Sequence, residues 1–169
     1  MIETARRDIP DNHPIRKLFQ NLTERGFEQQ HLHDEETIRY VSNLLTDFVD
    51  ADKVLRARTA FRTIGQDCSG MSKEARRDYY RSLGDLTLFY LGIYPEHLTY
   101  GRHTVSPGFY TRQGRMFYQI VAGMEPSRTT AVFRKLSDQF EQCVDGLNWV
   151  RLYVHDPFYQ YVFREFGVT

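Results

Sequence analysis

The side chains best suited to chemistry gather around the longest apolar stretch of the chain. Asp85 stands where this stretch begins, and His97 and His103 follow its end. Further along, Arg112 and Arg115 lie on one side of a predicted helix, from which a guanidinium could reach Asp85 or hold an anion. A histidine beside such a site would titrate near neutral pH. These residues therefore predict a pocket for a small anionic ligand, and a catalytic use of that pocket stays open.

A structural role for the same residues is the alternative. The run over 86–93 has almost no polar side, and a helix that is apolar all round is a buried central helix. A carboxylate at the end of such a helix needs a partner, because an unpaired buried charge is costly. We therefore favour a buried pair between Asp85 and Arg112 or Arg115 that fixes the register of two helices. The irregular segment beyond the helix remains the place to look for a site.

Other candidate groups have simpler interpretations. Cys68 lies in a glycine-containing loop and is the best nucleophile by position, but no neighbouring base is identifiable, so we interpret it as an ordinary thiol. Cys143 falls at an apolar position and is expected in the core. His31 and His33 could point at one ion, yet no third ligand is apparent. We predict no metal site and no cofactor, and the common catalytic motifs are absent.

The charge of the chain is balanced, with 22 Lys and Arg against 22 Asp and Glu in 169 residues. Domains that bind nucleic acid through bulk charge are usually strongly basic, so this balance argues against such a role. One basic group remains, with few acidic residues between positions 53 and 66; it is made of Arg56, Arg58, Arg62, Arg76, Arg77 and Arg81. It could contact phosphates, although a solvated helix face is the simpler interpretation.

The termini and the cysteines bear on location. The N-terminal residues lack the apolar core of a signal peptide, and no apolar run approaches the roughly 20 residues of a membrane span. With only two cysteines, far apart in the sequence, a disulfide framework is not expected. These features predict a reduced, cytoplasmic protein without a membrane segment.

Apolar residues recur with helical spacing along nearly the whole chain, and strand signals are weak. We predict an all-α fold, a single compact bundle of about six or seven helices. Residues 1–12 are expected to be a flexible N-terminal segment, and residues 13–169 a single domain. A central apolar helix is expected near 73–94, where Gly84 and Gly92 either weaken it or let another helix approach closely.

Local signals place the ends of several helices. Pro14 starts and Gly26 ends the first helix, Asp34 caps the second, and Ser72 begins the central one. Further helices are expected over 54–64, 110–124 and 157–166.

A long heptad-patterned helix is expected near 127–155. Its apolar positions are separated alternately by three and four residues: Phe133, Leu136, Phe140, Cys143, Leu147, Val150 and Val154. We favour packing of this seam inside its own bundle, because the other helices have complementary apolar faces. Pairing of the seam with a second copy is the alternative.

The sequence also resembles a known group of proteins. The resemblance is carried by the segments 13–19, 40–49, 84–96 and 136–148, which read HPIRKLF, YVSNLLTDFV, GDLTLFYLGIYPE and LSDQFEQCVDGLN. Their pattern resembles a family of small uncharacterised bacterial all-α proteins of unknown function, over about residues 13 to 150. The resemblance implies a bacterial, single-domain, soluble protein and adds no catalytic residue.

Together these features predict a non-enzymatic all-α binding or interaction module that self-associates or binds another protein. The prediction rests on the missing catalytic motifs, the heptad seam and the aromatic C-terminal segment 158–166. One alternative is a bundle that binds a small molecule or anion, with or without catalysis, near Asp85, His97 and Arg112. A further alternative is nucleic-acid contact through the arginines from Arg56 to Arg81.

Overall fold

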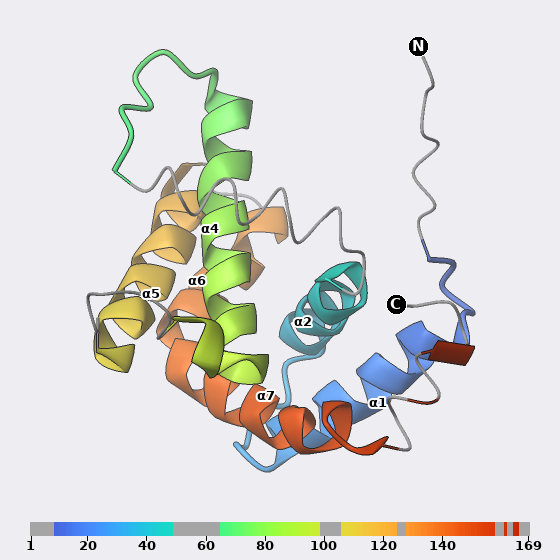
Figure 1. The fold of residues 1–169 in the computed structure, drawn as a ribbon. Coiled ribbons are helices and arrows are strands. Elements are labelled where there is room, and N and C mark those ends of the chain that lie inside the picture. Colours follow the sequence, from blue (N-terminus) through green and yellow to red (C-terminus); the bar gives the residue numbers. More distant parts are fainter. Residues whose placement is uncertain are drawn as a thin grey trace.

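The regular structure of the described residues is helical throughout (Figure 1). The computed structural model describes residues 9–48, 65–98, 106–124 and 128–157, together with residues 161, 164 and 165. Their helices are α1 (Pro14–Glu28), α2 (Glu35–Phe48), α4 (Lys73–Ile93), the 3-10 helix η1 (Pro95–Leu98), α5 (Pro107–Met124), α6 (Arg128–Asp138) and α7 (Phe140–Val154). The predicted all-α bundle is confirmed. The predicted helix over 54–64, residues 1–8 and most of the helix over 157–166 lie outside the described residues.

Short side chains and Pro14 set the starts of three helices. Pro14 occupies the first turn of α1, where its missing N–H costs nothing. The Asp34 carboxylate accepts a hydrogen bond of 2.9 Å from the backbone N–H of Thr37 in α2, and the Ser72 hydroxyl accepts one of 3.1 Å from Ala75 in α4. Each bond satisfies one of the N–H groups that a helix start leaves without a partner. These predicted helix starts are therefore confirmed.

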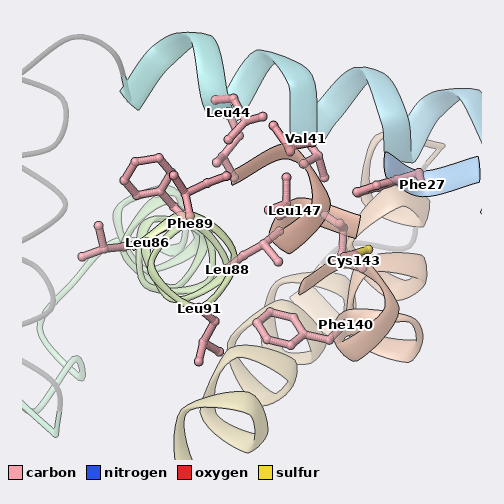
Figure 2. Close-up of a cluster of buried hydrophobic side chains, with 14 of the residues drawn as sticks. Phe27, Val41, Leu44, Leu86, Leu88, Phe89, Leu91, Phe140, Cys143 and Leu147 are labelled. Carbon is pink, nitrogen blue, oxygen red and sulfur yellow. The ribbon is translucent and has the colours of Figure 1, made fainter. Parts of the chain in front are cut away.

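Helix α4 is the centre of the fold. Every residue from Leu86 to Ile93 is buried, as the apolar sequence predicts. In Figure 1, α5 lies beside α4, α7 crosses near its end, and α1 and α2 lie on the other side. Figure 2 looks along α4 and shows Phe89 extending toward α2 and Leu88 toward α7. Burial of one such leucine or phenylalanine contributes about 1.5–3 kcal/mol, so this helix holds the surrounding elements on several sides.

Glycines let the helices approach α4 closely. A Cβ atom on Gly84 would lie 2.8 Å from the ring of Tyr118 in α5, and one on Gly92 would overlap Leu147 in α7. Of the two predicted roles for these glycines, close approach is therefore the one observed. Gly26 has the same role, and its prediction as a helix end is wrong. A Cβ there would lie 2.5 Å from the Gly146 carbonyl oxygen, and α1 continues to Glu28.

The long helix expected near 127–155 is two helices. The prediction of one continuous helix is wrong, because the backbone departs from helical angles at Gln139, with φ −109° and ψ 24°. The break has a physical reason in packing. Helix α6 packs mainly on α5, whereas α7 packs mainly on α4 and α1, and one straight helix would have to follow a single set of partners.

The heptad seam nevertheless keeps its predicted face across this break. All seven of its residues, from Phe133 to Val154, are buried in the chain's own core. Leu147 of the seam lies between α7 and α4 in Figure 2, where it packs against Gly92. Packing inside the bundle, the interpretation favoured from the sequence, is therefore the one observed. A second copy cannot use this face without unfolding the bundle.

The first two helices form a pair that meets the rest of the bundle unevenly. Helix α1 packs closely on both α2 and α7, whereas α2 touches α4 lightly. Two polar contacts support the α2 side: Lys135 of α6 pairs with Asp34, and Tyr40 of α2 reaches Asp85 of α4. Asp85, the first residue of the predicted site, therefore lies at this boundary between α2 and α4. None of the helices in the described part combines the length and apolarity needed to cross a membrane.

Candidate functional site

Asp85 joins three helices through hydrogen bonds to two tyrosines. The hydroxyl of Tyr40 in α2 donates to Oδ1 of Asp85 over 2.7 Å, and the hydroxyl of Tyr118 in α5 donates to the same oxygen over 2.8 Å. Oδ2 of Asp85 lies 3.7 Å from Nε of Arg81, one turn earlier on α4. We call these four residues the Asp85 junction. Its carboxylate is 15% exposed, so it is held mainly by the protein rather than by water.

Aromatic rings surround the junction. The ring of Phe133 in α6 lies 5.2 Å from that of Tyr40, edge to face, and 5.9 Å from that of Tyr118. The Arg81 guanidinium lies over the Tyr40 ring, 5.9 Å from its centroid. The two tyrosines that bond to the carboxylate are therefore themselves packed against an aromatic ring of α6. Such surroundings favour the neutral form of a carboxylic acid.

The pKa of Asp85 reflects these surroundings. Burial raises the pKa from its ordinary value of 3.8 to about 6, and the charge of Asp47 in α2 adds to the increase. The Arg81 charge and the two tyrosine hydrogen bonds act in the opposite direction without overcoming the burial. The pKa values of Tyr40 and Tyr118 are raised well above 10, chiefly by burial, so both hydroxyls keep their protons and remain donors.

The two carboxylate oxygens of Asp85 have different tasks. Oδ1 accepts both tyrosine hydrogen bonds, which uses the two lone pairs that such an oxygen offers. Oδ2 faces Arg81, whose side chain is 50% exposed. A proton can therefore bind Oδ2 near pH 6 while Oδ1 keeps both tyrosines. The chemistry available at this junction is proton binding, and its geometry also ties α2 and α5 to α4.

The predicted arginine partners of Asp85 lie elsewhere. Asp85 pairs with Arg81 on its own helix, so the prediction of a pair with Arg112 or Arg115 is wrong. The register between helices is fixed by the tyrosines instead. The spacing of Arg81 and Asp85, four residues apart on one helix, was readable from the sequence. Nothing in the sequence pointed to Tyr40, because it lies 45 residues from Asp85.

Arg112 and Arg115 line a separate open groove between α5 and α7. It has a volume of about 390 Å³ and is lined by Gly108, Thr111, Arg112, Arg115, Glu141, Val144 and Asp145. We call it the α5–α7 groove. Across this groove, Nη1 of Arg115 lies 3.8 Å from Oε1 of Glu141. Because the two arginines face two carboxylates, the groove does not present the excess of positive charge that an anion site needs.

The remaining predicted residues are only partly described. His97 belongs to η1, but its side chain lies outside the described residues, and so does the whole of His103. Arg56, Arg58 and Arg62 lie outside them as well. The structure therefore leaves the histidines of the predicted pocket and half of the predicted basic group as predictions, while Arg76, Arg77 and Arg81 of that group lie on α4.

The two cysteines are both buried, free thiols. The thiol of Cys68 donates a hydrogen bond of 3.4 Å to the backbone carbonyl oxygen of Gln66. A carbonyl oxygen cannot take the thiol proton, so this contact does not activate Cys68 as a nucleophile. Burial raises the pKa of Cys143 to about 12, which keeps it a neutral core residue, as the sequence predicts. Among the described residues, no three His, Cys, Asp or Glu side chains gather in a way that would hold a metal ion.

Comparison with known proteins adds no relative. No protein-family model, no curated protein and no solved structure matches this chain. The resemblance to a family of small bacterial proteins therefore stays a prediction. The function has to be argued from the Asp85 junction and the α5–α7 groove themselves.

Proposed function

We propose that this protein is a non-catalytic interaction module that self-associates through the α5–α7 groove. The observation that carries the proposal is a pair of opposite charges on the two walls of this groove. Arg112 stands on α5 and Asp145 on α7. Neither makes an ion pair or a hydrogen bond with another described residue, and both side chains belong to exposed positions.

A two-fold arrangement of two copies would satisfy both charges. In an interface of this kind the same patch is used twice, so a residue on α5 of one copy meets a residue on α7 of the other. Arg112 of each copy would then face Asp145 of its partner. Complementary charges of this kind fix orientation and register between partners.

Exposed apolar side chains beside the groove would supply buried surface. Phe109 and Met116, one turn before and one turn after Arg112, are 39% and 40% exposed. Leu152, two turns beyond Asp145 on the exposed side of α7, is 69% exposed. Apolar and aromatic groups mixed with arginine are typical of protein interfaces.

A cytoplasmic location is part of the same proposal. It is supported by the free thiols of Cys68 and Cys143, since thiols persist in a reducing compartment.

A charge-swap experiment tests the proposed interface. Arg112→Asp and Asp145→Arg each place like charges opposite one another in the homodimer, so each variant alone should sediment as a monomer. Mixed together, the two variants should form a heterodimer, because both contacts are again between opposite charges. The double variant should self-associate as the wild type does.

Arg134→Asp serves as the matched control, since Arg134 is exposed on α6 away from the groove. It should leave association unchanged. Sedimentation velocity at several concentrations measures all of these states. A wild-type protein that stays monomeric at high concentration, or single variants that fail to restore association when mixed, would overturn the proposal.

A further inference from the structure

The lightly packed side of α2 is held by a titratable group. Helix α2 packs mainly on α1, and its backbone approaches α4 at few positions, where the ring of Phe48 lies 4.8 Å from that of Phe89; α1 is packed closely on α7 through Gly26 and Gly146. The hydrogen bond from Tyr40 to Asp85 spans this lightly packed boundary. Its strength therefore adds to the apolar contact of Phe48 with Phe89 in holding α2 against α4.

We propose that Asp85 is a proton-controlled latch that holds α2 on α4 and α5 more firmly when its Oδ2 carries a proton. With the proton bound, Asp85 is neutral, and its Oδ1 still accepts from Tyr40 and Tyr118. With the proton released, the junction holds a charge that its surroundings solvate poorly. Separation of α2 from α4 then lets water reach that charge, so the open arrangement is favoured by deprotonation.

Charged and titratable groups face Asp85 from each neighbouring helix. Helix α4 itself provides Arg81, α2 provides Tyr40 and Asp47, and α5 provides Tyr118. Helix α7 provides Cys143, which acts on Tyr118, while α6 provides the apolar ring of Phe133. Arg81 is the only cation among them, and it is half-exposed, so solvent weakens its support of the charged carboxylate.

The direction of the effect follows from linkage. The pKa of Asp85 is raised to about 6 in the closed junction, and in an open junction it would return toward its ordinary value of 3.8. The closed form therefore binds the proton more tightly, and its advantage is complete below about pH 4 and lost as the pH rises through 6. Because of this difference in the pKa of Asp85, the ratio of the closed to the open form falls by about tenfold between pH 5 and pH 7.5.

Hydrogen exchange of the α2 backbone amides tests the latch. Protection of α2 is measured relative to α7 at pH 5 and pH 7.5, after correction for the intrinsic exchange rate. The wild type should lose about tenfold of its α2 protection at the higher pH. Asp85→Asn should show no such loss, because its side chain does not titrate. Equal protection of wild-type α2 at both pH values, or the same loss in Asp85→Asn, would overturn the proposal.

Two further measurements keep the test decisive. Asp138→Asn removes an exposed carboxylate of α6 and should keep the wild-type pH dependence. If Asp85→Asn does not fold, the carboxyl carbon of Asp85 is followed by NMR in the wild type, and a midpoint near 4 instead of 6 would refute the latch. None of the four junction residues lines the α5–α7 groove, so this result is independent of self-association.

Discussion

The Asp85 junction and the α5–α7 groove contain the same two charged residue types in opposite settings. Asp85 is mostly buried, with a side chain that is 15% exposed, and it accepts hydrogen bonds from the hydroxyls of Tyr40 and Tyr118. Asp145 and Arg112 line an open groove and have no ion-pair partner among the described residues. Burial raises the free energy of ionising Asp85, whereas water solvates the charged side chains of Arg112 and Asp145 and leaves them free to pair with another molecule. The junction therefore acts on the fold, and the groove is available to a partner.

Loss of the Tyr118 side chain should break the junction most severely. Tyr118 is fully buried, and Tyr118→Ala removes its ring from the core and one hydrogen bond from Asp85, so we expect a loss of about 3–5 kcal/mol in the free energy of unfolding. Urea denaturation at pH 7.5 measures it. Gln119→Ala, at an exposed position of the same helix, should change stability by less than about 0.5 kcal/mol. Similar losses for both variants would contradict the assigned difference in burial.

Removal of the charge at Asp85 should have the second-largest effect on the free energy of unfolding, and this effect should depend on pH. Because the folded pKa of about 6 lies above the ordinary 3.8, the stability that the bound proton contributes is lost as the pH rises through 6. We expect the stability of Asp85→Asn relative to the wild type to grow by about 2–3 kcal/mol between pH 4 and pH 7.5. Urea denaturation over this range measures the difference. A difference that does not vary with pH would mean that Asp85 titrates as an ordinary surface carboxylate.

Replacement of Arg81 should change the free energy of unfolding less, while it shifts the titration of Asp85. Its ion pair with Asp85 is within one helix and half-exposed, so we expect Arg81→Met to cost only about 0.5 kcal/mol at pH 7.5. The NMR titration midpoint of Asp85 should move upward, because the cation that favours the charged carboxylate is gone. Arg77→Met, at a position of α4 away from Asp85, is the control. A downward shift of the midpoint would show that Arg81 does not favour the charged form.

Charge reversal in the groove should have the smallest effect on folding. Arg112 is exposed, so Arg112→Asp should change the free energy of unfolding by less than about 0.5 kcal/mol while abolishing self-association. Denaturation of the monomer and sedimentation of the same sample separate the two effects. A large loss of stability would show that Arg112 belongs to the fold, as Asp85 does, and would remove the contrast between the two regions.

Local sequence was sufficient for several parts of the fold. The apolar run over 86–93 predicted a central helix because no solvent-facing side remained, and the buried residues of α4 confirm it. Asp34 and Ser72 predicted helix starts because a cap acts over only three residues. The heptad spacing from Phe133 to Val154 predicted a buried face correctly.

Other features depended on contacts between distant parts of the chain. The bend at Gln139 depends on α6 and α7 having different partners, which spacing along one helix does not report. Arg112 looked as suitable a partner for Asp85 as any other cation, since a charge pair depends on distance in space. The tyrosines that hold Asp85 come from helices 45 residues before it and 33 residues after it.

Local patterns in the chain are enough to predict that the described segments are helical, where three of the helices begin and which faces are apolar, because these features depend on residues within a few positions of one another. What Asp85 binds, and which charges remain available to a partner, follows from the packed bundle instead. Burial and the choice of hydrogen-bond partners arise only when helices pack against one another. The same aspartate is an ordinary acid on an isolated helix and a proton-binding group between Tyr40 and Tyr118.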